Sequence, residues 1–436
     1  MLLETRGKET QVVPEFVYKE RLPNGLRVLV HEMPWAQSVC VRLLVAGGHC
    51  DEDQSNIGMA HFLEEMIARG SVRYPSYKAI NEKSVALGGK VTKFSTGDEY
   101  MQYGFKVGSE NLPHAVSLLR EVVFNPLLRE GDIRGVKKQL NNEINSERDD
   151  LKKYRWKYLK RCAWGTHPLG YNRLGTNDSV AQITRDSLLD FYGRQYRPDR
   201  LILTICGGIK QQEVLPSVKE SFQDLVLPDK PLQVAIAPVY TPGEQRVFVE
   251  TRDREIVHIL LAFSTEGHGL RSPREPIYSL LRNIAGPEIF YRLYDESSIA
   301  YEVSATDVYV TDNGLMTFNA TVAPGNVERA VDEMVEIVRD LSITEESAAN
   351  AKTRRKTGFI DIESTNSFAD FIGDQELFTG QVKSLVTKRR EIDDVTIEQL
   401  ALCKQELFSR SNVCLVLLGG VTDSIIERLD SKLKFA

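Results

Sequence analysis

Hydrophobic and polar residues follow two rhythms along this chain, one typical of strands and the other of helices. The segments "GLRVLVHEM" and "VCVRLLVAGG" are rich in β-branched residues and end at turn residues, which predicts two strands. Helical spacing follows over residues 58–69 and 76–87, and then "KVTKFSTGDEYMQYGFKV" alternates as a β-hairpin does. One long polar helical region is predicted over residues 129–162.

The same order of elements starts again in the second half of the chain. After Leu225, the stretch "VLPDKPLQVAIAPVYTPGEQ" carries four prolines and little periodicity, which indicates a linker. From Gln245 onward, an apolar strand, a loop with Gly and His, and a helix follow as they do in the first half. We therefore predict an N-terminal domain over residues 1–227, a linker over 228–244 and a similar C-terminal domain over 245–436.

Composition narrows the class of protein. The 436 residues are 42% hydrophobic and 27% charged with a net charge of -6, which is ordinary for a globular protein and unlike a nucleic-acid binder. No run of about 18 apolar residues is present, so we expect no membrane span. Six cysteines without a Cys-x-x-Cys pair and an N-terminus without a signal-like apolar stretch favour a reducing compartment, so we expect a cytoplasmic protein.

The segment "GMAHFLEEMIAR" at residues 58–69 carries the candidate chemistry. His61 and Glu65 are four residues apart and so share one helix face, where an imidazole and a carboxylate can bind one metal ion. Glu64 lies one step round the helix and can reach a metal-bound water as a general base. A third ligand must come from another segment, and Glu143 in "NNEINSERDD", 82 residues after His61, is the best candidate.

Other interpretations of this helix stay open. A zinc-protease signature would have a second histidine where Glu65 stands, so the helix is either a metal site with an altered ligand or a site that has lost its metal. A lone histidine beside acidic residues on an amphipathic helix is also often only a buried structural side chain. The spacing by itself is compatible with all three.

Several blocks together resemble the inverzincin metallopeptidases, the pitrilysin, insulinase and mitochondrial-processing-peptidase family with its His-x-x-Glu-His signature. The similar segments cover most of the chain: "ERLPNGLRVLV", "GMAHFLEEMIARGSVRYPS", "ALGGKVTKFSTGDEYMQYGF", "NNEINSERDD", "THPLGYNRLGT", "FYGRQYRPDRLILTICGG" and "AYEVSATDVYVTDNGLM". The resemblance implies a half-size member with a His-x-x-Glu-Glu motif. Its implied fold is α+β, with two similar domains that each have a mostly antiparallel sheet and helices on one face, forming half of a clamshell.

The resemblance assigns roles to the candidate residues. It gives His61 the first metal-ligand position, Glu64 the general base and Glu143 the distal ligand, while Glu65 stands in place of the second ligand histidine. Zinc is the implied cofactor, with manganese or no metal as alternatives, because two carboxylates neutralise the ion and zinc favours imidazole over oxygen more than manganese does. Without a metal, the carboxylates of Glu64, Glu65 and Glu143 should lie close together and raise each other's pKa values.

Two further departures concern the surroundings of the site. A frequent family glutamate seven residues before the distal ligand is Val136 here, and a substrate-holding arginine of the second domain falls on Tyr294. The tyrosine that accompanies that arginine in the family is matched by Tyr301, which is therefore a candidate substrate-binding residue.

A second functional element is implied that does not depend on a metal. The family lays an extended peptide along an edge strand, and the matching residues here are Val91, Thr92, Lys93, Phe94 and Ser95. Backbone pairing along an edge gives affinity that tolerates many sequences. The alternative is that this segment is an internal strand without a binding role.

The resemblance leads to three hypotheses of function. The first is a zinc-metallopeptidase-like protein that acts on unfolded or short peptides inside a dimeric chamber. The second is a non-catalytic subunit that completes the chamber and binds peptide for an active homologous peptidase, so a heterodimer is favoured over a homodimer. The third is a scaffold subunit of a larger complex, without affinity for peptides.

Overall fold

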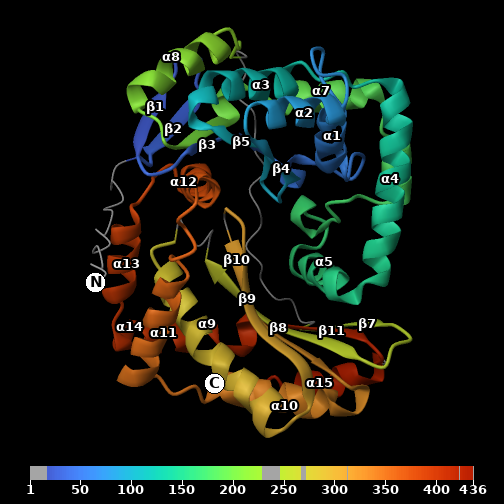
Figure 1. Ribbon diagram of the computed structural model, residues 1–436. Coiled ribbons are helices and arrows are strands. Elements are labelled where there is room, and N and C mark those ends of the chain that lie inside the picture. Colours follow the sequence, from blue (N-terminus) through green and yellow to red (C-terminus); the bar gives the residue numbers. More distant parts are fainter. Residues whose placement is uncertain (1–16, 228–245, 267–271, 312, 422, 436) are drawn as a thin grey trace, which may run out of the picture.

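A computed structural model describes residues 17–227, 246–266, 272–311, 313–421 and 423–435 (Figure 1). The predicted linker over 228–244 lies outside these residues. Within them, no helix is long and apolar enough to cross a membrane.

The first half of the chain builds a six-stranded sheet. Its strands, in spatial order, are β1 (Tyr18–Arg21), β2 (Arg27–Glu32), β6 (Leu201–Gly207), β3 (Ser38–Ala46), β5 (Tyr100–Gly108) and β4 (Lys90–Thr96). All neighbours are antiparallel except β2 and β6, and the predicted hairpin is the β4–β5 pair. The helices of this half are α1 (Met59–Ala68), α2 (Tyr77–Ala86), α3 (Leu112–Phe124), α4 (Glu130–Asp149), α5 (Leu151–Trp164), α6 (Asn177–Gln182), α7 (Arg185–Gln195) and α8 (Gln211–Phe222).

The predicted helix over residues 129–162 is wrong as a single helix. It breaks at Asp150, whose backbone (φ -90°, ψ 89°) leaves the helical region. The Asp150 carboxylate then accepts hydrogen bonds from the backbone N–H groups of Lys152 and Lys153 and so caps α5. The break matters for the site, because it sends α4 past α1 and α5 toward the second sheet.

The second half repeats the plan with a five-stranded sheet. Its strands, in spatial order, are β7 (Val247–Thr251), β11 (Val413–Gly419), β8 (Val257–Glu266), β10 (Asn313–Val322) and β9 (Ala300–Tyr309), with only β7 and β11 parallel. Its helices are α9 (Glu275–Phe290), α10 (Val327–Arg339), α11 (Glu345–Thr357), α12 (Thr365–Thr379), α13 (Leu385–Asp393), α14 (Ile397–Leu407) and α15 (Ile426–Lys432). A π-helical turn, Tyr291–Glu296, extends α9. The prediction of two similar α+β domains is therefore confirmed.

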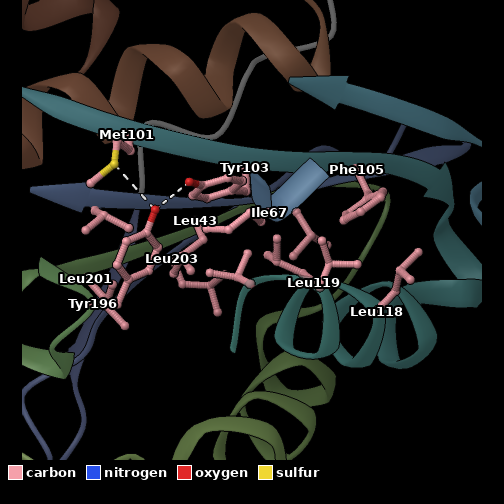
Figure 2. Packing of buried hydrophobic residues seen from close by; sticks show 14 of the residues in the cluster. Leu43, Ile67, Met101, Tyr103, Phe105, Leu118, Leu119, Tyr196, Leu201 and Leu203 are labelled. Atoms are coloured by element: carbon pink, nitrogen blue, oxygen red, sulfur yellow. Dashed lines mark hydrogen bonds between the residues drawn. The ribbon is translucent and has the colours of Figure 1, made fainter. Parts of the chain in front are cut away.

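Each sheet buries one face under helices of its own half of the chain. In the first half, α3 packs on β3 and β5 and α1 packs on β4, and the side chains of Tyr103 and Tyr196 meet in the same buried cluster through their hydroxyl groups (Figure 2). The Tyr196 hydroxyl also donates to the sulfur of Met101 at 3.4 Å. This buried cluster includes the apolar face of α1, the helix that carries His61 and Glu64.

The other face of the first sheet is covered by α12, which comes from the second half of the chain (Figure 1). Phe368 of α12 is 5% exposed and stacks on the ring of His31, with 3.9 Å between ring centroids. At Gly373 the helix lies so close that an added Cβ would stand 3.0 Å from the Leu44 side chain. The buried guanidinium of Arg42 pairs with Asp370 of the same helix.

The second sheet receives a helix from the first half in return. Leu159 and Trp164 of α5 pack in one buried cluster with Leu260 and Val416 of the second sheet. The indole N–H of Trp164 donates to the side-chain oxygen of Asn313 at 2.8 Å. The two halves are thus fixed to each other by an exchange of helices that the hydrophobic pattern alone did not reveal.

Replacing Phe368 by Ala tests this exchange. We expect the free energy of unfolding to fall by about 3 kcal/mol, because a buried aromatic ring is removed and a cavity is left against the sheet. Urea unfolding followed by tryptophan fluorescence measures the change, with Phe290→Ala as a control, since Phe290 is 38% exposed. Equal losses in the two variants would show that α12 does not hold the first sheet.

Candidate functional site

The helix α1 starts at a position that only glycine adopts readily. Gly58 has φ +91°, in the left-handed region, and its ideal Cβ would stand 2.8 Å from the backbone of Gly175. The buried carboxylate of Glu52 accepts hydrogen bonds at 2.8 Å from the backbone N–H groups of both Gly58 and Ala60. These contacts satisfy N–H groups that have no partner inside the helix and so fix the first turn, where His61 lies.

The structure brings two of the three predicted metal ligands, His61 and Glu143, into direct contact with each other and His61 into contact with the predicted general base, Glu64. Nε2 of His61 lies 3.3 Å from a carboxylate oxygen of Glu143 on α4, and Nδ1 of His61 lies 3.2 Å from a carboxylate oxygen of Glu64. The hydroxyl of Thr96, at the end of β4, donates to the same Glu64 oxygen at 3.1 Å. Two segments 82 residues apart therefore meet at one imidazole.

Glu65 is held differently, by a residue that the sequence analysis missed. The side-chain amide of Gln139 on α4 donates one hydrogen bond to Glu65 at 3.0 Å and another to Glu143 at 2.9 Å. Its carbonyl oxygen accepts from the guanidinium of Arg69, just after α1. Gln139 is one helical turn before Glu143, and this spacing is the only sequence signal that could have indicated it.

The contacts within the cluster shift the pKa values of its members in different directions. Burial lowers the pKa of His61, but the hydrogen bonds with Glu143 and Glu64 outweigh it and raise the pKa to about 9. Burial and the neighbouring Glu64 raise the pKa of Glu65. The hydrogen bond with His61 lowers the pKa of Glu143, so the expectation that the carboxylates all raise each other's pKa values is wrong for this residue.

The arrangement does not fit a catalytic zinc ion as it stands. Such an ion takes three protein ligands and keeps one position for water. In the part of the chain that the structure describes, no group of three His, Cys, Asp or Glu side chains could hold a metal ion. Both ring nitrogens of His61 face carboxylates, and Glu65 is engaged by the Gln139 amide.

The remaining predicted residues lie elsewhere. Val136 is on the buried face of α4 and is fully buried in the core, where a carboxylate would have no partner among the apolar side chains. Tyr301 opens β9 and is 66% exposed, and Tyr294 is 49% exposed in the π-helical turn. Among the contacts of the described residues, none joins Tyr301 to His61, Glu64 or Glu143.

The predicted peptide-binding residues are on an edge strand. β4 is the last strand in the order of the first sheet and pairs only with β5 among the described strands. A β-bulge at Thr92 interrupts the pairing between Val91 and Lys93. The internal-strand alternative is thereby excluded for the described sheet, while peptide binding at this edge stays a prediction.

A cavity of about 780 Å³ opens over the cluster. It is bounded by His61, by the α4 residues Gln139 and Glu143, and by Arg173 from the loop before α6. The strand β4 ends beside it, because Thr96 contacts Glu64 through its hydroxyl and Arg173 through its carbonyl oxygen. An extended chain along β4 would therefore reach this cavity.

Two family profiles match the sequence. "Insulinase (Peptidase family M16)" matches residues 27–177, which include α1 and α4, and "Peptidase M16 inactive domain" matches residues 182–354. The chain belongs to peptidase family M16. The predicted resemblance to the insulinase and mitochondrial-processing-peptidase family is thus confirmed.

Individual M16 relatives match over nearly the whole chain. An "uncharacterized zinc protease" of Mycobacterium leprae is 28% identical over 409 residues, covering 90% of each protein. The mitochondrial-processing peptidase subunit beta of Lentinula edodes is 23% identical over 424 residues, or 92% of this chain and 89% of that protein. A solved protease of Helicobacter pylori has the same fold, with TM-score 0.84 at 18% identity over 93% of this chain and 99% of that one.

Gln139→Ala tests whether the amide holds the cluster together. We expect the free energy of unfolding to fall by about 1 kcal/mol at neutral pH, because Glu65 and Glu143 lose their shared donor and Arg69 loses its acceptor. Urea unfolding gives the change. Asn142→Ala is the matched control, since Asn142 is exposed on the same helix and lines the same cavity. If the two variants unfold alike, the amide does not bridge the carboxylates.

Proposed function

We propose that this chain is a non-catalytic subunit that binds peptide and completes a chamber for a homologous M16 partner with an intact His-x-x-Glu-His motif. The observation that carries this proposal is the Gln139 amide, which donates to both Glu65 and Glu143. In this arrangement Glu65 is held against Gln139 on α4, whereas the side-chain contacts of His61 are with Glu64 and Glu143. His61 with Glu143 alone is one ligand short of a catalytic zinc shell.

Peptide binding is supported by the edge strand rather than by the altered cluster. β4 has an open side in the described sheet, so an extended peptide can add to it through main-chain hydrogen bonds. The cavity over His61 and Glu143 then receives side chains at the end of that strand. None of these interactions requires a metal. The His61 imidazole and the Glu143 carboxylate then only line the cavity as polar groups.

A second subunit is supported by aromatic side chains left in solvent. Phe290, Tyr291, Tyr294 and Tyr301 are 38%, 51%, 49% and 66% exposed and lie at the end of α9, in its π-helical turn and at the start of β9. The rings of Phe290 and Tyr294 are stacked with 5.0 Å between centroids. Aromatic residues are enriched at protein interfaces, which favours this region as part of the contact with the partner.

One observation favours a second candidate, a metallopeptidase with an unusual shell of His61, Glu65 and Glu143. The imidazole of His61 does meet Glu143, and the carboxylate of Glu64 lies buried beside them where a general base is predicted. For this function, the Glu65 side chain must rearrange so that one of its oxygens reaches the same point as His61 and Glu143, while Gln139 now holds the other oxygen. The first proposal needs no such rearrangement, and we therefore favour it.

Metal analysis separates the two candidates. We expect the purified chain to hold little zinc, and Glu65→His to bind about one zinc ion per chain, because an imidazole supplies the missing third ligand. Zinc content is measured by mass spectrometry after dialysis. Glu82→His on α2 adds a histidine at another exposed helix position and should stay without zinc.

Peptide cleavage gives the functional readout. We expect no cleavage of an unfolded reporter peptide by this chain alone, and faster cleavage when it is added to a copurifying M16 partner. The proposal fails if the chain cleaves the peptide by itself and Glu64→Gln stops that cleavage. In that case the metallopeptidase candidate replaces it.

A further inference from the structure

Beside the cavity over His61 lies a smaller, cationic pocket between α5, the turn after β4 and the loop before α6. We infer that this pocket binds a carboxylate of the peptide, either an acidic side chain or the C-terminal carboxylate, with Arg173 as the residue that selects it. The inference rests on the proposed function, because it names the class of peptide that the chain prefers.

The pocket is continuous with the site already described. It has a volume of about 320 Å³ and shares Glu147, Lys153 and Arg173 with the larger cavity. Its other wall is formed by Trp156 and Tyr171, whose rings offer apolar surface for the carbon atoms of a bound residue. A peptide in the larger cavity can therefore place a neighbouring group here.

The pocket is positive although the whole chain carries a net charge of -6. Four cationic side chains and two carboxylates line it. The cations are Lys153, Lys157, Lys160 and Arg173, and the carboxylates are Asp98 and Glu147. His49, also in the lining, adds no charge at neutral pH, because burial lowers its pKa to about 4. The surplus of positive charge favours an anionic ligand.

Two of the cations are already paired. Lys160 pairs with Asp98, and the ammonium of Lys157 lies 3.7 Å from a carboxylate oxygen of Glu147. Lys153 lies 3.4 Å from Asp150, but its side chain is 71% exposed, so this ion pair is screened by water. The fixed carboxylates of Asp98 and Glu147 also repel a dianion, which favours a singly charged carboxylate over a phosphate.

Arg173 and the exposed Lys153 are the cations that remain for a ligand, and Arg173 is the one with donors in a fixed plane. Its guanidinium donates to the carbonyl oxygen of Thr96 at 3.1 Å. It also contributes to lowering the pKa values of Asp98 and Glu143 by its charge, but it forms no direct ion pair with a carboxylate among the described residues. A guanidinium has five N–H donors in one plane and binds a carboxylate with two parallel hydrogen bonds. One backbone acceptor leaves enough donors for that contact.

Arg173 also lies at the end of β4, along which the proposed peptide would pair. Thr96 is the last residue of β4, and it contacts Glu64 through its hydroxyl and Arg173 through its carbonyl oxygen. A strand added to β4 therefore passes the His61 cavity and the Arg173 guanidinium in turn. In this arrangement, pairing with β4 tolerates many peptide sequences, and the contact with Arg173 selects those that place a carboxylate beside it.

Fluorescence anisotropy with three labelled peptides of one unfolded sequence tests the inference. The first has one internal Glu and a free C-terminus, the second has that Glu replaced by Gln, and the third is amidated at its C-terminus. We expect one of the two changes to weaken binding to the full-length chain about tenfold, as loss of a charge-assisted contact does. The weakened peptide identifies which carboxylate is bound.

Arg173→Gln should weaken the first peptide by the same factor and leave the weaker peptide unchanged. Arg194→Gln, which removes an arginine from α7 with its side chain 44% exposed, is the matched control and should change none of them. The inference is overturned if all three peptides bind wild type equally, or if inorganic phosphate competes as well as acetate does. If no peptide binds wild type at all, the proposed function falls together with it.

Discussion

The fold depends on one constraint: the central strands of both sheets have buried side chains on both faces, and each half of the chain supplies helices for only one face of its own sheet. The second face must still be removed from water, and each half does this for the other. Helix α12 closes the first sheet through Phe368 and Gly373, and α5 closes the second through Leu159 and Trp164. The relative position of the two sheets is therefore set by core packing and not by a surface contact that could slide. The site inherits that rigidity, since α5 and the loop after it bound the cationic pocket.

Within this frame, the cluster around His61 is a closed set of donors and acceptors. The His61 imidazole contacts the carboxylates of Glu64 and Glu143. The Gln139 amide donates one hydrogen bond to Glu143 and one to Glu65. Arg69 completes the set through the amide oxygen. The carboxylates of the cluster are thus contacted by an imidazole and an amide, and the amide in turn is contacted by a guanidinium. Buried polar groups are stable when they have hydrogen-bond partners, so these contacts help to hold helices α1 and α4 together.

The sequence was informative wherever hydrophobic periodicity or a family motif carried the signal. It indicated the two α+β halves, the β4–β5 hairpin and the meeting of His61 with Glu143. It was not informative where the outcome depended on tertiary contacts between polar side chains. Gln139 belongs to no metal motif, so its role could not be predicted. The pKa of Glu143 was expected to rise and is lowered instead, because its hydrogen bond with His61 outweighs the effect of burial. The break at Asp150 was missed because the polar residues around it are compatible with a helix. The exchange of α5 and α12 leaves no local pattern at all.

The β-bulge at Thr92 has a consequence for which chains the protein can take up. Regular pairing with β5 resumes only at Lys93 and continues to Thr96, so the flat part of the edge is four residues long. A bulge bends its strand and increases the local twist, which spoils the match with a long, straight strand. A preformed sheet from an aggregated protein would gain few hydrogen bonds here, whereas a single flexible segment can follow the bend. The bulge therefore makes the open side of β4 a poor match for a long, straight strand of another sheet, while a short, flexible segment can still follow its bend.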